Sequence, residues 1–105
     1  MNEILVLSTT DTLDLAQKIA STLVREREAA CVNIVPGIHS VYCWEGKECN
    51  DSEFLLLIKT SEERFEAVQA RIRQLHTYQV PEIIALTITS GDPRYLAWLR
   101  EGIKE

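Results

Sequence analysis

The feature that most constrains this chain is a long stretch, residues 29–60, that the residue pattern predicts to be one β-hairpin. Apolar residues alternate along the first arm as far as Trp44, and the polar segment 45–47, Glu-Gly-Lys, supplies the reversal that such alternation requires. The return arm contains an unbroken apolar run at 54–58, which indicates a central strand covered on both faces. The sequence therefore predicts two long antiparallel strands whose turn lies near Gly46.

The length of this hairpin carries a further consequence. An arm from Cys31 to Trp44 would measure about 45 Å at about 3.3 Å per residue. A compact chain of 105 residues is only about 33 Å across. The arm must overhang its own domain, or bend at Pro36-Gly37, where proline removes a ladder donor and glycine permits a bulge. An overhanging ribbon needs a second copy to bury Tyr42 and Trp44, whereas a bent hairpin would fold back on its own core.

The remaining segments alternate between helix and strand patterns. We expect a strand over 3–9, a helix over 11–28, a helix over 60–76, a strand over 82–89 and a terminal helix over 93–101. Right-handed crossovers then give one α+β domain, residues 1–105, with a ferredoxin-like βαββαβ sandwich plus a C-terminal helix. Because the helices cover one face of the four-stranded antiparallel sheet, the other face stays partly open, which is a second argument for an oligomer.

Capping signals set the expected starts of the helices. Asp11 is the expected N-cap of the first helix, and Thr60 with Glu63 forms the T-x-x-E capping box of the second. In the terminal helix, Asp92 is the expected N-cap and is followed by proline at the first helical position. Trp98 falls on the apolar side of that helix and is expected in the core.

Composition narrows the function. A net charge of −5 argues against nucleic-acid binding, which depends on Lys and Arg neutralising phosphates. The longest apolar run has five residues, so we expect no helical membrane span. The N-terminal segment carries no positive region before its apolar run, and the three cysteines are an odd number. We therefore expect no secretory signal and a cytoplasmic protein with free thiols.

No pattern in the sequence forms a strong catalytic motif, and we expect a protein that is not an enzyme. Cys31 begins a strand among small apolar residues, which favours a buried core thiol over an activated nucleophile. His76 falls at a helix C-terminus, where a histidine is an ordinary partner of the helix dipole. Four carboxylates surround the hairpin tip and are expected to be solvated turn residues, with weak affinity for hard divalent cations: Glu45, Glu48, Asp51 and Glu53.

Cys43 and Cys49 lie symmetrically about Gly46, each three positions away. With a loop of residues 45–47 they would face each other across the ladder, close enough for a soft metal ion or a disulfide. With a two-residue turn, Cys43 pairs with Glu48 or Asn50 and no such site forms. Both alternatives are open at the level of sequence.

Four segments of the chain resemble the CutA divalent-ion tolerance family, at similar spacing and over nearly the whole length. They are AACVNIVPGIHSVYCWEGK at 29–47, LLLIKTS at 55–61, HTYQVPE at 76–82 and GDPRYLAWL at 91–99. The resemblance implies a ferredoxin-like fold and a tight homotrimer in which long hairpins lock the subunits together. It also implies a link to copper and other divalent metals.

The resemblance also implies two sets of site residues. Copper ligands proposed in one branch of the family fall here on Ser8, Leu75 and His76, of which only His76 can bind a metal well. We therefore expect no tightly bound cofactor, and at most a weakly held divalent cation such as copper. Clefts between subunits would be lined by Trp44, Lys59, Tyr78 and Glu82. The alternative function is a regulatory or scaffolding trimer similar to PII-like signalling proteins, with incidental metal binding.

Overall fold

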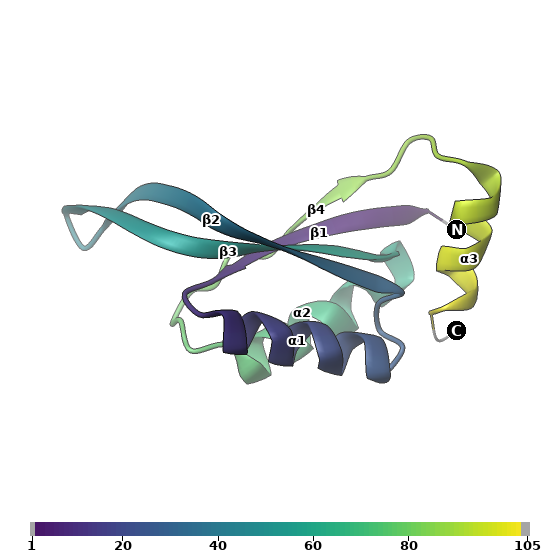
Figure 1. Ribbon diagram of the computed structural model, residues 1–105, viewed down its shortest axis with the longest axis horizontal. Helices are drawn as coiled ribbons and strands as arrows, with labels where there is room; N and C mark the ends of the chain where they lie inside the picture. Colours follow the sequence, from purple (N-terminus) through teal and green to yellow (C-terminus); the bar gives the residue numbers. More distant parts are fainter. Residues whose placement is uncertain (1, 104–105) are drawn as a thin grey trace.

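A computed structural model describes residues 2–103 as a four-stranded antiparallel sheet, with two α-helices on one face and a third at one end of the sheet (Figure 1). The strands are β1 (Glu3–Thr10), β2 (Cys31–Trp44), β3 (Lys47–Ser61) and β4 (Ile84–Thr87), in the spatial order β2-β3-β1-β4. The helices are α1 (Leu13–Arg25), the 3₁₀ turn η1 (Glu62–Arg64), α2 (Phe65–Leu75) and α3 (Pro93–Glu101). The predicted order of strands and helices is confirmed. None of the described helices is long and apolar enough to cross a membrane.

The hairpin turn is shorter than the predicted reversal. β2 and β3 pair as far as Trp44 opposite Lys47, so the turn consists of Glu45 and Gly46 alone. Both residues have positive φ, 51° and 79°, which is the condition for a type I′ turn. The right-handed twist of this turn matches that of the two strands, which explains why the ladder continues to the last residue of each arm.

The predicted irregularity at Pro36-Gly37 is confirmed as a β-bulge. Val35 pairs with Leu55 and Ile38 with Glu53, so two residues of β2 oppose one residue of β3. Gly37 has a φ of 74°, a conformation that glycine adopts without steric cost. The bulge does not fold the hairpin back, because the outer half of β2 and β3 projects well beyond the helices (Figure 1). The molecule is accordingly 44 Å long against 25 and 21 Å in its other dimensions.

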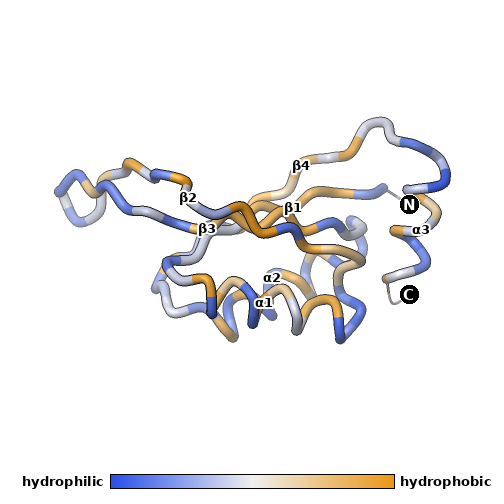
Figure 2. The backbone as a smooth tube through the Cα atoms, in the orientation of Figure 1, coloured by the Kyte–Doolittle hydropathy of each residue, from blue (hydrophilic) through white to orange (hydrophobic). Residues whose placement is uncertain are grey.

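The core lies between the helices and one face of the central strands. Alternate residues of β1 and β3 point to this side, among them Val6, Leu56 and Ile58, and all three are fully buried. Apolar side chains of the helices pack against them, including Val68 and Ile72 of α2. In Figure 2 the backbone is hydrophobic in the central part of the sheet and hydrophilic at the hairpin tip.

Two of the helix starts bear on the capping predictions. α1 begins one residue later than expected, because Thr12 and not Asp11 is its N-cap and accepts a hydrogen bond from the Leu15 amide at 3.1 Å. The terminal helix is confirmed: the Asp92 carboxylate accepts from the Tyr95 amide at 3.0 Å.

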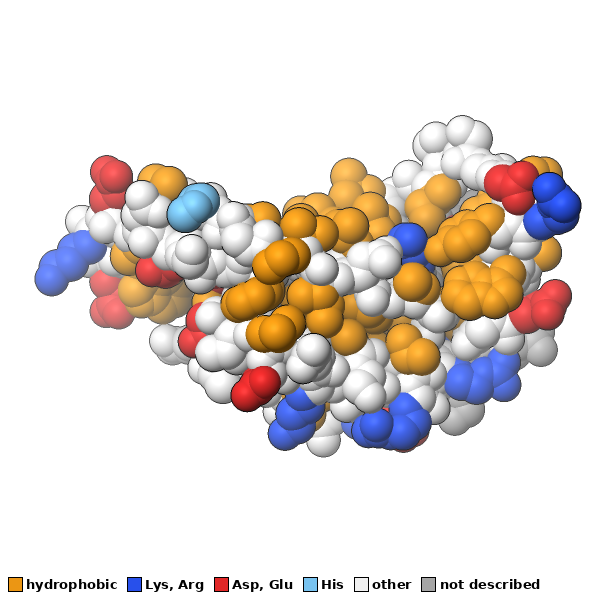
Figure 3. Space-filling model, viewed as in Figure 1, with side chains coloured by type: hydrophobic (Ala, Val, Ile, Leu, Met, Phe, Trp, Pro, Cys, Tyr) orange, Lys and Arg blue, Asp and Glu red, His pale blue; other side chains and the backbone are white. Residues whose placement is uncertain are grey.

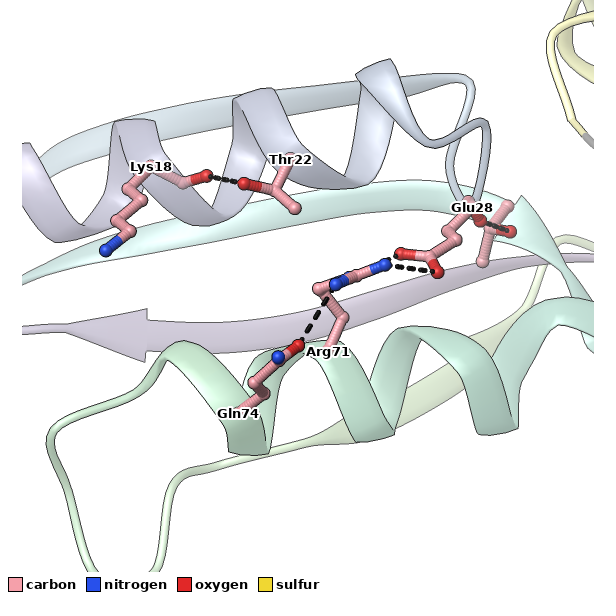
Figure 4. Close-up of polar contacts among 6 residues, drawn as sticks. Lys18, Thr22, Glu28, Arg71 and Gln74 are labelled. Carbon is pink, nitrogen blue, oxygen red and sulfur yellow. Dashed lines mark hydrogen bonds and ion pairs between the residues drawn. The ribbon is translucent and has the colours of Figure 1, made fainter.

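The capping box predicted at residues 60–63 is wrong, since Thr60 belongs to β3 and its hydroxyl donates to the Glu28 carbonyl at 2.7 Å. α1 ends at Arg25, short of the expected end near Glu28, which leaves Glu28 in the connection to β2. There its carboxylate receives two hydrogen bonds from Arg71 of α2, at 3.1 and 3.2 Å (Figure 4). One residue thus joins the α1 end to both β3 and α2.

The face of the sheet opposite α1 and α2, here called the open face, is apolar and largely uncovered. Its residues are Leu5, Leu7, Val35, Leu55, Leu57, Ile84 and Leu86. Ile84 is 51% exposed and Leu86 is 49% exposed. The predicted half-covered sheet is therefore confirmed. Figure 3 shows hydrophobic side chains gathered over the middle of the molecule and again near its α3 end.

Trp98 adds to this exposed apolar surface. It is 51% exposed and lies beside Tyr95, with ring centroids 5.6 Å apart, so its predicted place in the core is wrong. The reason is the position of α3, which packs at one end of the sheet and buries only Leu99 fully. The helix has too little of the sheet beneath it to cover a second large side chain.

A buried hydroxyl gives the first testable expectation. Ser8 is fully buried on the helix side of β1, and its Oγ has no hydrogen-bond partner among residues 2–103. We expect Ser8→Ala to raise the free energy of unfolding by about 1 kcal/mol, because it removes a desolvated and unpaired polar group. Urea denaturation followed by circular dichroism measures the change.

The matched control is Thr60→Val, which removes a buried hydroxyl that does donate a hydrogen bond. It should lower the free energy of unfolding by about 1 kcal/mol. A Ser8→Ala chain that is destabilised as much as Thr60→Val would show that the Ser8 hydroxyl has a partner in solution.

Candidate functional site

His76 anchors the segment that leads from α2 to β4. Its Nε2 lies 2.7 Å from the Thr9 carbonyl, and the Tyr78 amide donates to its Nδ1 at 3.0 Å. Since an amide N–H only donates, Nδ1 is the acceptor and the ring proton lies on Nε2, facing the carbonyl. Both nitrogens are thus engaged in backbone hydrogen bonds, so His76 would have to give up one of them to bind a metal ion, and its metal-ligand role stays a prediction.

Tyr78 extends from that segment to the hairpin. Its hydroxyl donates to Glu53 Oε2 at 2.5 Å, and its ring lies 4.5 Å from that of His76. Burial of the Tyr78 ring, followed by its hydrogen bond to Glu53, raises the pKa of Tyr78, which therefore stays protonated. Glu53 is only 6% exposed, so its expected place among solvated turn residues is wrong.

The hairpin presents aromatic side chains on the same side as Glu53. In the ladder beyond the bulge, Ile38 pairs with Glu53 and Tyr42 with Cys49, so alternate residues from Ile38 to Trp44 share a face with Glu53. The Tyr42 hydroxyl donates to the Asp51 carboxylate, and this hydrogen bond raises the pKa of Tyr42 to about 12. Tyr42 is therefore held in place as a neutral ring.

These groups enclose a cleft of about 410 Å³ between the hairpin and the segment 76–83. Its lining includes Tyr42, Trp44, Glu53, Tyr78, Val80 and Glu82. Three of the residues predicted for a cleft, Trp44, Tyr78 and Glu82, are thus brought together within one chain. Tyr42 was missed as a site residue, and Glu53 was predicted only as one of the carboxylates around the hairpin tip with weak affinity for divalent cations.

The fourth predicted cleft residue, Lys59, lies elsewhere. Its Nζ donates to the Tyr95 hydroxyl at 3.2 Å and sits 5.4 Å from the centroid of the Tyr95 ring. Lys59 therefore belongs to the contact between β3 and α3 and does not line this cleft.

The two-residue turn decides between the alternatives for the cysteines. Cys43 pairs with Glu48, and Cys49 pairs with Tyr42, so the two thiols lie on opposite faces of the ribbon. The predicted metal or disulfide pair of Cys43 and Cys49 is therefore wrong. Cys31 is only partly buried, in contrast to its predicted place as a core thiol. Within residues 2–103, no group of three or more His, Cys, Asp or Glu side chains is arranged to hold a metal ion.

The fold and the cleft define a class of protein: a small α+β sandwich with a projecting β-ribbon and an acidic, aromatic cleft at its root. The family model described as CutA1 divalent ion tolerance protein matches residues 4–102. The chain therefore belongs to the CutA1 divalent ion tolerance family.

Individual relatives agree with this assignment. The divalent-cation tolerance protein CutA of Thermus thermophilus is 50% identical over 99 residues, covering 94% of this chain and 96% of that protein. The chloroplastic CutA of Arabidopsis thaliana is 48% identical over 96% of this chain, which spans only 56% of that protein. The crystal structure of CutA1 from Oryza sativa superposes with a TM-score of 0.97 at 44% identity, covering 100% of this chain and 96% of that one.

Proposed function

We propose that this chain forms a homotrimer that contributes to divalent-metal tolerance by binding cations weakly and a small ligand in its clefts. The acidic cleft at the hairpin root is the observation that carries the small-ligand part of this proposal. The strand order β2-β3-β1-β4 supports a ferredoxin-like topology, because the two crossovers place α1 and α2 together on one face.

Two features of the fold support the trimer. The open face carries half-exposed leucine and isoleucine side chains, and the hairpin extends beyond the core of its own chain. A ring with three-fold symmetry lets each hairpin pack on its neighbour and covers sheet edges that would otherwise template aggregation. In this arrangement the cleft at the hairpin root lies close to a subunit boundary.

The metal part of the proposal rests on charge. Three chains of net charge −5 give 3 × (−5) = −15, which concentrates cations near the surface but is screened beyond about 8 Å at physiological salt. Burial of Ser8 beneath the helices and the engagement of both His76 nitrogens support the proposal that the copper site implied by the family does not form in this chain. Metal binding of low affinity and without a fixed stoichiometry fits these observations.

Calorimetric titration with Cu²⁺ and Zn²⁺ at low and high salt tests this part. We expect weak binding that declines with ionic strength, and little change in either His76→Ala or His76→Gln. One sharp site per chain that both substitutions abolish would overturn it. The glutamine variant guards against misfolding, since an amide can replace both hydrogen bonds of the ring.

We propose a binding role and no catalysis. His39 lies eight positions from Cys31 on β2, about 26 Å along the strand, and His76 is engaged by the backbone. Neither imidazole is placed to activate the Cys31 thiol. The cytoplasmic location stays a prediction, and the names of two relatives place those proteins in a chloroplast and a periplasm.

The second candidate function is a regulatory or scaffolding trimer whose metal binding is incidental. The observation that favours it is the lack of a metal-binding constellation among residues 2–103. Growth of a strain without this protein in copper-rich and zinc-rich media separates the two functions. Unchanged tolerance would favour the regulatory role.

A further inference from the structure

The cleft at the hairpin root combines negative charge with aromatic side chains. Glu53 and Glu82 supply two carboxylates, and none of the described lining residues is a lysine or an arginine. Tyr42, Trp44 and Tyr78 supply the aromatic surface. This composition repels anions and attracts cations that also have an apolar body.

We propose that this cleft binds an organic ammonium ion, namely a primary amine with a small apolar body. The inference deepens the small-ligand part of the proposed function and rests on it, whereas the metal part is independent. The cleft volume of about 410 Å³ lies within the range of small-molecule sites.

Glu53 determines the polar end of this ligand. It is more than nine-tenths buried, and its Oε2 accepts from the Tyr78 hydroxyl. Among residues 2–103, no hydrogen-bond donor reaches Oε1, the other oxygen of this cleft-lining carboxylate. The fully desolvated, unpaired side-chain atoms of the described residues are the hydroxyl oxygens of Ser8 and Ser61, so Oε1 of Glu53 remains accessible from the cleft. An ammonium N–H offers this oxygen both a donor and a compensating charge.

The aromatic residues determine the other end. Tyr42 and Tyr78 are fixed by hydrogen bonds to Asp51 and Glu53, and both stay neutral because their pKa values are raised. Trp44 remains partly exposed at the cleft and offers the strongest cation–π partner among side chains. The alkyl groups next to an ammonium nitrogen carry part of its positive charge. Because these groups are weakly hydrated, they contact an aromatic ring at little desolvation cost.

A bare metal ion fits the cleft less well. A tight divalent site takes three or more converging ligands, and the described residues contain no such group. Two carboxylates joined to aromatic surface suit a cation whose contacts are partly apolar. The chemistry of the cleft thus selects an amine over a hydrated metal.

Titration with n-butylammonium chloride tests the proposal, with 1-butanol as the neutral probe of similar shape. The buffer contains EDTA, and the readout is Trp44 fluorescence in a Trp98→Phe chain, which leaves Trp44 as the one tryptophan. We expect a saturable change with one n-butylammonium per chain. We expect 1-butanol to bind at least about tenfold more weakly, since it lacks the charge-assisted hydrogen bond.

Glu53→Gln should weaken n-butylammonium binding at least about tenfold. The matched control is Glu48→Gln, which removes the same charge from an exposed hairpin residue paired with Cys43 on the other face. It should leave binding unchanged. If Glu53→Gln fails to fold, Glu82→Gln replaces it, with an expected loss of about threefold.

Three outcomes would overturn the proposal: no saturable change in the native oligomer, equal binding of 1-butanol, or equal weakening by Glu48→Gln and Glu53→Gln. The absence of a saturable change would mean that a neighbouring chain fills the cleft. Equal weakening by the two substitutions would mean that n-butylammonium responds only to the overall charge of the protein. Because chelator is present, a failure here leaves the metal titration untouched. A failed metal titration likewise leaves an observed amine site intact.

Discussion

A chain carrying Leu86→Glu is expected to elute as a monomer of about 12 kDa, whereas the proposed trimer of the unaltered chain is expected to elute near 3 × 12.0 kDa. Leu86 pairs with Leu5 within the open face and is 49% exposed in the single chain. A glutamate there places an unpaired carboxylate in the proposed interface of all three copies, at a desolvation cost of several kcal/mol each. Size-exclusion chromatography with light scattering at micromolar concentration measures the change.

The matched control is Leu13→Glu. Leu13 is also a leucine of similar exposure, 43%, but it lies at the start of α1 in the helical layer. This variant should keep the mass of the unaltered protein. A trimer that survives Leu86→Glu would remove the open face from the interface, and an unaltered protein that runs as a monomer would refute the trimer altogether.

The second large effect concerns the core. Leu56→Ala is expected to lower the free energy of unfolding by about 3–5 kcal/mol, through lost transfer energy and the cavity that remains. Leu56 is fully buried at the centre of β3, with Ser8 opposite it on β1 and Ile34 opposite it on β2. Urea denaturation in the Leu86→Glu background measures this cost without the contribution of subunit assembly.

Leu13→Ala in the same background provides the comparison, because it removes the same atoms from a half-exposed position. Its cost should stay below about 1 kcal/mol, since little apolar area is lost from a buried site. Equal costs for the two substitutions would place the true core away from Leu56.

The elements of the fold could be predicted from local patterns, but details that depend on backbone geometry could not. Alternation and helical spacing identify the strands and helices, and the Asp92-Pro93 signal places α3 correctly. The reversal at 45–47 is polar throughout, so composition does not tell a two-residue turn from a longer one. The two-residue turn requires positive φ at both Glu45 and Gly46, a conformation that glutamate rarely adopts.

The site likewise contains residues that could be predicted from the sequence and residues that could not. Trp44, Tyr78 and Glu82 could be assigned to a cleft from the family resemblance, and the structure brings them together. The burial of Glu53 was missed because it depends on Tyr78, which is 25 positions away and reaches Glu53 only through the loop that His76 anchors. No local pattern carries that information, since a glutamate near a hairpin tip is usually solvated.

The bulge at Pro36-Gly37 determines which side chains of the outer part of β2 point toward the open face. Before the bulge, odd-numbered residues such as Val35 point toward the open face. After the bulge, even-numbered residues such as Tyr42 and Trp44 point toward this face. Were Gly37 unable to hold its left-handed φ of 74°, a regular ladder would invert the phase of the whole outer strand. The rings of Tyr42 and Trp44 would then point to the opposite face of the ribbon, away from Glu53, so the aromatic character of the cleft depends on one dihedral angle of a residue without a side chain.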